Sequence, residues 1–254
     1  MTGKGFEFFQ EEHLYLLDGK PLTGVTTILG SVIAKPQLIP WAAKMATEYI
    51  SGNCAWDDKL EAYIVPETAL EQAKIAHRRK KEDAGEKGTD LHALVEEYVK
   101  MCIAANTTAI TFPPSDLPKF EPIVEFIRWA QTNKIRFLES EKRMYSRNWR
   151  LAGTADLIFE KEGKKYIGDV KTYAKIWDRV PFFQCAGYAN FYEEMSEGKD
   201  HIDGYCVLRL SKDGSFESKW SFDTEGDTKA FFAAVELYRQ LANYNKPTWG
   251  NTGR

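Results

Sequence analysis

The sequence predicts an α/β protein in which helices flank a central mixed sheet. From residue 83 onward, the hydrophobic pattern gives the order helix, helix, three strands, helix, strand, strand, helix. The chain has 254 residues, 43% hydrophobic and 13% aromatic, which suffices to bury one substantial core. We therefore expect one globular unit, in which residues 1–84 form an N-terminal hairpin and helical wing. Residues 85–254 are expected to form the core with its C-terminal strand and helix.

The N-terminal part combines extended and helical patterns. Residues 6–17 are extended in pattern, and a turn signal at 18–21, Asp-Gly-Lys-Pro, leads to the segment 25–29. Proline is tolerated in the first turn of a helix, and two apolar stretches follow a proline in this way. The predicted helices cover 41–50 and 67 to about 81.

In the core, the period of the apolar residues distinguishes helices from strands. Leu91, Val95, Tyr98 and Cys102 recur at three and four residues, as on the buried face of a helix. After about residue 134 the pattern becomes extended, with turn-like residues between the segments. Helices are predicted over 83–104, 119–132, 181–195 and 225–243, and strands over 135–146, 151–160, 164–171, 203–210 and 215–222.

Charge alone does not indicate a nucleic-acid partner, because the formal net charge is −3, with 34 Lys and Arg against 37 Asp and Glu. Basic residues are grouped in the run 77–81 and at Lys142, Arg143, Arg147 and Arg150. Such groups are either phosphate contacts or ordinary solvated faces. The distribution of charge is therefore more informative than its total.

The four cysteines are scattered along the chain and lack the spacing of zinc or iron-sulfur ligands. Free, mostly buried thiols are expected. The sequence has no run of eighteen apolar residues, and its N-terminus lacks the layout of a secretory signal. We expect a cytoplasmic protein that does not associate with a membrane.

Two aspartates and a lysine come together if residues 151–160 and 164–171 pair as an antiparallel hairpin. Pairing around Glu162-Gly163 places Asp156 directly across from Asp169. Lys171 shares a face with Asp169, because side chains alternate along a strand. Opposed like charges destabilise a sheet, and a divalent cation with oxygen ligands would offset that cost. The alternative is a surface strand with an ion pair between Lys171 and either aspartate.

These residues also carry a resemblance to a known family. Gly153-Thr-Ala-Asp156 followed by Asp169-Val-Lys171 resembles the signature of the PD-(D/E)XK nuclease superfamily. Gly88-Thr-Asp-Leu-His92 and Gln184-Cys-Ala-Gly-Tyr188 match the Gly-x-x-x-His and Gln-x-x-x-Tyr elements of its RecB-type branch. That branch includes phage-encoded exonucleases and the mitochondrial genome maintenance exonuclease. The matches extend over about residues 85–210 and imply a restriction-endonuclease-like core of helix, three strands, helix and strand.

The resemblance implies a metal site. Asp156 and Asp169 would be the carboxylate ligands, with the carbonyl of Val170 and the imidazole of His92 completing the coordination of Mg²⁺ or Mn²⁺. Lys171 would be the catalytic lysine. Glu141 matches a position at which the family often carries an acidic residue.

Two further glutamates leave alternatives open at this site. Glu139 shares a face of its strand with Glu141 and competes for the same role. Glu96 lies one helical turn after His92. It either holds the imidazole or a metal-bound water, or is a plain surface residue.

Substrate contacts are expected from two places. By resemblance, Gln184 and Tyr188, which share a helical face, help to position the lysine and the DNA strand; the alternative is helix packing. Trp149, between Arg147 and Arg150, would stack a base, or is a buried tryptophan at a strand end.

The expected function is hydrolysis of DNA phosphodiester bonds by metal-activated water, in particular by an exonuclease. The resemblance implies a phage or prophage protein of DNA recombination or processing, acting in a bacterial or phage-infected cell on single strands or duplex ends. The resemblance implies a single-strand annealing or replication protein as partner. Two alternatives are a catalytically silent DNA-binding or assembly protein on the same fold, and an iron-sulfur nuclease. The scattered cysteines argue against the second of these.

Overall fold

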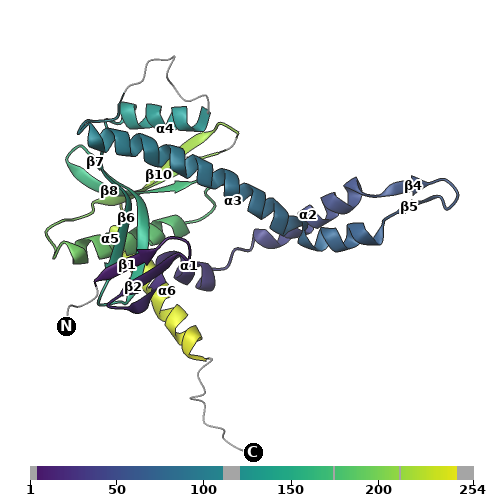
Figure 1. Ribbon diagram of the computed structural model, residues 1–254, viewed down its shortest axis with the longest axis horizontal. Coiled ribbons are helices and arrows are strands. Elements are labelled where there is room, and N and C mark those ends of the chain that lie inside the picture. Colours follow the sequence, from purple (N-terminus) through teal and green to yellow (C-terminus); the bar gives the residue numbers. More distant parts are fainter. Residues whose placement is uncertain (1–4, 111–120, 174, 212, 245–254) are drawn as a thin grey trace, which may run out of the picture. The chain divides into compact units, whose positions relative to one another are not determined.

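The computed structural model describes residues 5–110, 121–173, 175–211 and 213–244, without the side chains of residues 83–90, 121, 243 and 244. It is an α/β protein with a large mixed sheet (Figure 1). The elements in chain order are β1 Phe6–Phe9, β2 Leu14–Leu17, β3 Lys20–Gly24, α1 Val25–Val32, α2 Leu38–Gly52, β4 Ala55–Asp57, β5 Ala62–Ile64, α3 Glu67–Ala104, α4 Glu121–Thr132, β6 Arg136–Ser146, β7 Leu151–Lys161, β8 Lys164–Lys171, α5 Val180–Met195, β9 Gly204–Leu210, β10 Phe216–Ser221 and α6 Thr224–Tyr244.

The predicted order of elements from residue 83 onward is confirmed, but the N-terminal part differs from the prediction. The expected helices 67–81 and 83–104 are one continuous helix, α3. The sequence has no proline between residues 67 and 104, and the glycines within α3 weaken a helix without breaking it. The short β4–β5 hairpin was not predicted, because its strands have three residues each and show no clear alternation.

The sheet is built around β7, which has neighbours on both edges. Its strand order is β1-β2-β3-β7-β8-β9-β10, with β6 also paired to β7. Strands β6 and β8 are antiparallel to β7, whereas β3 runs parallel to it. Strand β9 is parallel to β8, as a connection through a helix allows. The sheet is therefore mixed, as predicted.

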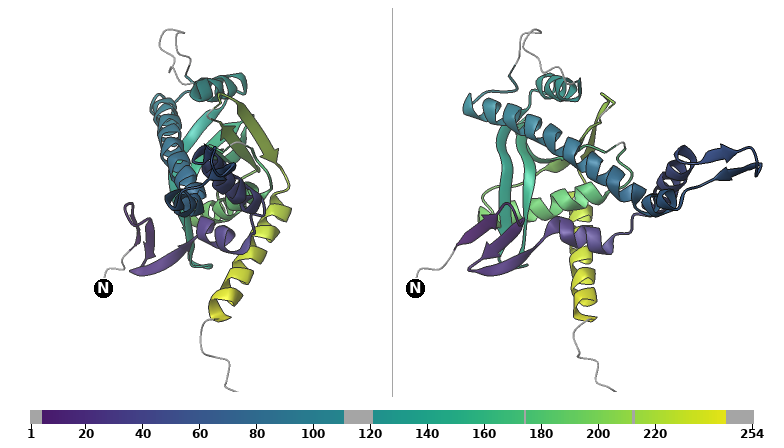
Figure 2. Two further views of the ribbon diagram at one scale, coloured as in Figure 1. Left: turned by 90° about the vertical axis from the view of Figure 1, so that its right-hand side faces the viewer. Right: turned by 45° about the vertical axis from the view of Figure 1, so that its right-hand side comes forward.

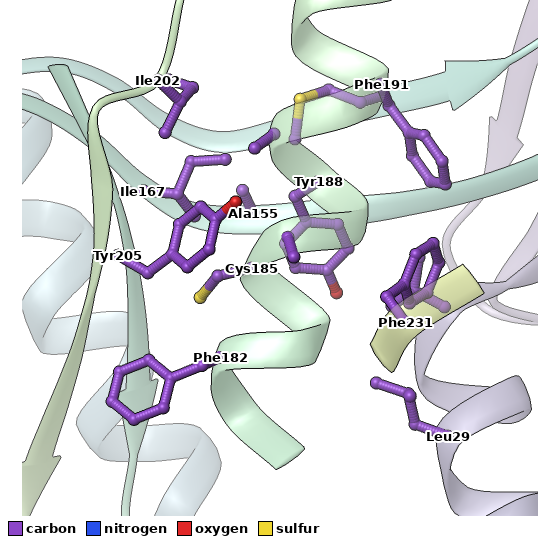
Figure 3. Packing of buried hydrophobic residues seen from close by; sticks show 14 of the residues in the cluster. Leu29, Ala155, Ile167, Phe182, Cys185, Tyr188, Phe191, Ile202, Tyr205 and Phe231 are labelled. Atoms are coloured by element: carbon purple, nitrogen blue, oxygen red, sulfur yellow. The ribbon is translucent and has the colours of Figure 1, made fainter. Parts of the chain in front are cut away.

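Helices cover both faces of this sheet (Figures 1 and 2). One buried cluster joins the sheet to α1, α5 and α6; Figure 3 shows part of it, including Tyr188 and Phe231. A second cluster joins the opposite face to α4 and to the part of α3 that begins at Leu91. Apolar side chains from both faces of the central strands enter these clusters, which explains why those strands read as nearly continuous hydrophobic runs.

Contacts divide the chain into two compact units, one of residues 1–33 with 91–254 and the other of residues 34–90. The prediction described residues 1–84 as a hairpin and helical wing within one globular unit. Strand β3 pairs with β7, which makes the N-terminal hairpin part of the large sheet. The sequence pattern cannot reveal this long-range pairing.

Two smaller expectations concern the cysteines and membranes. All four cysteines are free, and Cys102, Cys185 and Cys206 are buried, as predicted. Among the helices of the described residues, none is long and apolar enough to cross a membrane.

Candidate metal centre

The predicted register of the β7–β8 hairpin is confirmed. Leu157 pairs with Gly168, and the pairing continues in step to Lys161 and Lys164 at the turn. One more step in this register sets Asp156 opposite Asp169, but the ladder ends at Leu157. The two strands therefore part at the two aspartates.

The gap between β7 and β8 at the two aspartates arises because the strand paired to this edge of β7 changes from β3 to β8. Because β6 occupies one edge of β7, β3 and β8 must share the other edge. Strand β3 pairs with Leu151 and Ala152, whereas β8 pairs only from Leu157 onward. Asp156 lies between these two stretches. Its Oδ2 accepts a hydrogen bond from the backbone N–H of Val170 at 2.7 Å, in place of a strand partner.

Strand β6 brings a third carboxylate to the gap. Ser140 pairs with Leu157 and Lys142 with Ala155, which sets Glu141 opposite Asp156. Glu141 has φ +49°, and of the non-glycine residues with positive φ in the described ranges it alone lies inside a strand. This backbone conformation costs on the order of 1–3 kcal/mol and is found disproportionately at functional sites.

Helix α3 adds an imidazole to these carboxylates. Ligand atoms of His92, Glu141 and Asp156 all lie within 4.8 Å of one another. Nδ1 of His92 is 4.0 Å from Oδ2 of Asp156, too far for a hydrogen bond. Three potential ligands from three separate elements thus converge without bonding directly to one another, which leaves space for an ion between them.

Asp169 borders this group and is almost completely buried, with 1% of its surface exposed. Its Oδ1 accepts hydrogen bonds from Nζ of Lys171 at 2.6 Å and from Nε2 of Gln184 at 2.9 Å. The same Gln184 nitrogen lies 3.1 Å from the hydroxyl of Tyr188. The other oxygen, Oδ2, is buried and has no hydrogen-bond partner in the described structure. A buried carboxylate oxygen without a partner is costly, and a cation would satisfy it.

The carboxylates resist ionisation in the absence of a cation. Burial and the charge of Asp156 raise the pKa of Glu141 to about 7. Burial also raises the pKa of Asp169 to about 6, against the opposing effect of Lys171, and it raises the pKa of Asp156. Removing acidic groups from water without full charge compensation has this effect.

The surroundings shift the pKa values of the two basic groups, His92 and Lys171, in opposite directions. Burial and the positive charge of Lys171 lower the pKa of His92, so its imidazole is neutral and able to bind a metal. Burial would also lower the pKa of Lys171, but the charges of Asp169 and Asp156 outweigh burial and raise it. Lys171 is therefore an ammonium ion at neutral pH.

These residues fit a small divalent cation. One imidazole and two carboxylates, with the free oxygen of Asp169 nearby, form a mixed nitrogen and oxygen set. Carboxylate oxygens suit Mg²⁺ and Mn²⁺, and the imidazole favours Mn²⁺ over Mg²⁺. The resemblance implied His92, Asp156, Asp169 and Val170 as ligands. The structure adds Glu141 to the group and pairs Asp169 with Lys171.

Gly153 allows the helix bearing Tyr188 to lie close to β7. A Cβ built on Gly153 would lie 2.4 Å from Cε1 of Tyr188, well inside contact distance. The tyrosine ring therefore occupies the space that a larger side chain at position 153 would need. This gives a steric reason for the glycine of the Gly153-Thr-Ala-Asp156 motif.

The structure distinguishes among the competing glutamates. Glu139 forms an ion pair with Lys142 at 2.5 Å and is not one of the converging ligands. Glu96 pairs with Lys100, although its charge also contributes to the raised pKa of Glu141. Glu141 is thus the third carboxylate of the group.

The predicted substrate residues in the range 147–150 lie in the turn between β6 and β7, six or more residues beyond Glu141, or at least roughly 20 Å along an extended strand. Arg147 forms an ion pair with Asp18 at 2.8 Å. The ring of Trp149 packs on Phe232 of α6, with 4.3 Å between ring centroids. Arg150 is exposed. The structure does not bring Arg147, Trp149 and Arg150 together with the carboxylates.

Sequence analysis missed Tyr173, which follows Lys171 by two residues. Burial raises its pKa to about 12; the charge of Lys171 lowers the pKa and the charge of Asp169 raises it. The charges of both groups thus act on its hydroxyl, while 40% of the residue is exposed. Continuing the alternation from Asp169 and Lys171 by two more residues could have indicated it.

Comparisons with known proteins add little to this geometry. No protein-family model matches the sequence, and no curated protein matches it. One similar solved structure is described as "Crystal structure of SSO0001"; it is 12% identical with a TM-score of 0.27, and the match covers 49% of this chain and 61% of that chain. The chain thus spans less than two thirds of that protein. A TM-score this low supports no conclusion about fold or function, so the candidate centre must be judged on its own contacts.

Proposed function

We propose that the protein is a divalent-metal-dependent DNA nuclease of the RecB-type branch of the PD-(D/E)XK superfamily, with a restriction-endonuclease-like core. The observation that carries the proposal is the convergence of His92, Glu141 and Asp156, whose ligand atoms lie within 4.8 Å. The adjacent ion pair of Asp169 with Lys171 supports it. So does the element order α3, β6, β7, β8, α5, β9, apart from the inserted α4.

The proposed reaction is hydrolysis of a phosphodiester by a water molecule in line with the leaving oxygen. The bond between phosphorus and that oxygen breaks, and no covalent intermediate forms. His92, Glu141, Asp156 and the free oxygen of Asp169 would hold Mg²⁺ or Mn²⁺. When bound, the cation would lower the pKa of a coordinated water and neutralise charge on the phosphate.

The remaining residues orient the reaction. The ammonium group of Lys171 is held at 2.6 Å by Asp169 and would stabilise negative charge that builds up on the phosphate. Gln184 donates to the same aspartate oxygen and thereby fixes the carboxylate that holds the lysine. Tyr188 contacts Gln184 and is itself fixed against Gly153.

We further propose an exonuclease that processes DNA ends in phage or prophage recombination, a role that rests on the resemblance of the motifs. The alternative is a catalytically silent DNA-binding or assembly protein. Intact Asp156, Asp169 and Lys171 favour catalysis, because a chain that had lost the activity would be expected to have lost one of the three residues.

The test is cleavage of labelled DNA by the full chain. Linear single strands, linear duplex and covalently closed circles are incubated with Mg²⁺ or Mn²⁺, with and without EDTA. We expect EDTA-sensitive degradation of linear DNA and little attack on circles. Asp156→Asn should reduce the rate by roughly 10²–10³-fold or more, whereas Glu160→Gln, four residues along the same strand, should not. Absence of EDTA-sensitive cleavage on every substrate would contradict the proposal, and binding without cleavage would favour the alternative.

A further inference from the structure

The segment 172–179 connects two elements that both carry residues of the candidate centre. It begins directly after Lys171, at the end of β8, and ends at α5, which carries Gln184. Because Nε2 of Gln184 lies 2.9 Å from Oδ1 of Asp169, both ends of the segment are tied to the centre. The segment therefore borders the site of the proposed reaction.

Internal contacts anchor the segment. Ile176 is 4% exposed and packs in the cluster of α1, α5 and α6. Its carbonyl accepts a hydrogen bond from Nζ of Lys219 at 3.3 Å. Arg179, at the end of the segment, donates to Oδ1 of the buried Asp227 at 2.6 Å. Trp177, which lies between these two anchored residues, is thus presented from a fixed stretch of backbone.

Two exposed aromatic residues and one cation lie on the described part of this segment. Tyr173 is 40% exposed and Trp177 is 64% exposed. Nζ of Lys175 lies 4.9 Å from the centroid of the Trp177 ring. Asp178, the acidic neighbour, accepts a hydrogen bond from the N–H of Val180 at 3.0 Å, so its charge is directed at the start of α5.

This combination has the chemistry of a single-strand binding site. Unpaired bases stack on exposed aromatic faces, and an adjacent ammonium group attracts the phosphates. Base pairs in the interior of a duplex are stacked on both sides and do not expose their faces to such rings. A stable protein interface requires roughly 800 Å² on each partner, which two rings and one lysine do not supply.

We infer that Tyr173, Lys175 and Trp177 bind the single-stranded part of the DNA next to the bond that is cut, so that the substrate is a single strand or a single-stranded end. This inference rests on the proposed function. Trp177 is six residues after Lys171, so its Cα lies at most about 20 Å away along the chain. The bases that it stacks are therefore those within a few nucleotides of the cleaved bond.

The inference is tested by binding of fluorescein-labelled oligothymidine and of a blunt duplex to the full chain in EDTA, where no cleavage occurs. Trp177→Ala should weaken binding of the single strand by roughly 5- to 100-fold and leave binding of the duplex unchanged. Trp177→Phe should retain most of the affinity, because it keeps a ring. Lys175→Ala should lower the dependence of single-strand binding on salt by about one phosphate contact.

Phe222→Ala is the matched control. Phe222 is 67% exposed and stacks on Trp220, next to Tyr166 at the opposite end of β8 from Lys171. This variant should bind both DNA forms as the unchanged protein does. A circular dichroism spectrum of each variant checks that it is folded.

Several outcomes would overturn the inference. The inference fails if Trp177→Ala binds the single strand with unchanged affinity. It also fails if the variant loses equal affinity for the single strand and for the duplex. If the variant instead loses self-association while its DNA binding is unchanged, the ring belongs to a protein contact. The proposed function fails separately, when the unchanged protein cuts no DNA with any metal. A protein that cuts DNA but whose Trp177→Ala variant binds normally refutes only the inference.

Discussion

At one end of the β7–β8 hairpin the strands close in a tight turn, and at the other end they part around two aspartates. The turn residues Glu162 and Gly163 have φ +54° and +75°, the positive values that a two-residue hairpin turn requires. Lys161 pairs with Lys164 beside the turn, and the ladder is regular from there to Leu157. Local conformational preference accounts for this end.

The aspartate end departs from those preferences. The strand ladder stops, Glu141 on the neighbouring strand takes a positive φ, and Oδ2 of Asp169 is buried without a hydrogen-bond partner among the described residues. Ala155 and Ile158 lie in one core cluster while Leu157 and Phe159 lie in the other, so the alternation of β7 is interrupted at Asp156. The difference between the two ends indicates that the aspartate end is shaped for binding at a cost in stability.

Two lysines on β8 test this difference most directly. Lys171→Ala should reduce the rate of cleavage roughly 10²–10³-fold, because it removes the ammonium group that lies 2.6 Å from Asp169. Lys164→Ala, at the exposed turn end of the same strand, should cleave like the unchanged protein. Initial rates on labelled linear DNA at saturating Mn²⁺ are the measurement, and equal rates for the two variants would refute the assigned role.

Metal binding at the aspartate end should raise the free energy of unfolding of the protein. A cation at 100 times its Kd adds about 2.7 kcal/mol to the free energy of unfolding, which raises Tm by roughly 5–10 °C for a chain of this size. We expect this shift when Mn²⁺ is added to EDTA-treated protein, measured by circular dichroism. Asp156→Asn should abolish the shift and Glu160→Gln should preserve it; the same shift in both would place the metal elsewhere.

Substitutions at two glycines distinguish a lack of space for a side chain, at Gly153, from a requirement for positive φ, at Gly163. Gly153→Ala should destabilise the fold by about 1–3 kcal/mol and slow cleavage, because its Cβ would displace the ring of Tyr188. Gly163→Ala has open space around its Cβ but keeps φ +75°, so it should cost about 1–2 kcal/mol with unchanged cleavage. Urea unfolding and cleavage rates together check this. Normal cleavage by folded Gly153→Ala would show that the position of Tyr188 is unimportant.

The pH dependence of stability should have opposite signs at the two ends. Folding raises the pKa of Glu141 from 4.5 to about 7 and that of Asp169 from 3.8 to about 6. Their contribution to stability is complete below the unfolded values and is lost as pH rises to about 7, because the unfolded chain releases these protons more readily. At the turn, Lys161 lowers the pKa of Glu162, so that contribution is lost as pH falls.

In EDTA, therefore, Tm should decline between about pH 4.5 and 7 relative to the Glu141→Gln variant. Glu162→Gln should instead follow the unchanged protein across this range, except for a small difference at its acidic end. Thermal unfolding in a pH series is the measurement. A Tm difference between the unchanged protein and Glu141→Gln that stays constant with pH would contradict the raised pKa of Glu141.

Much of the site could be predicted because it depends on local order. The alternation of strands and the turn at Glu162-Gly163 determine that Asp156 opposes Asp169 and that Lys171 shares the face of Asp169. The helical spacing of Gln184 and Tyr188 places both on one side of α5. These relations follow from the period of each element and the length of one turn.

Local order does not identify the third carboxylate, which only the resemblance indicated as Glu141, with Glu139 as a competitor. A register shift between Phe137 and Glu139 moves β6 by one residue against β7. Without the shift, Ser140 would oppose Asp156; with it, Glu141 does. A bulge of this kind changes which side chains face a partner strand, and the sequence of the strand alone does not mark its position.

By itself, the sequence determined the order of the core elements, the register of the hairpin and the shared face of Asp169 and Lys171, because each depends on neighbours a few residues away. Only the tertiary structure decided that α3 is continuous, that β3 and β8 share one edge of β7, and that His92 and Glu141 meet Asp156. These features depend on contacts between residues far apart in the chain, whose free energies no local pattern records.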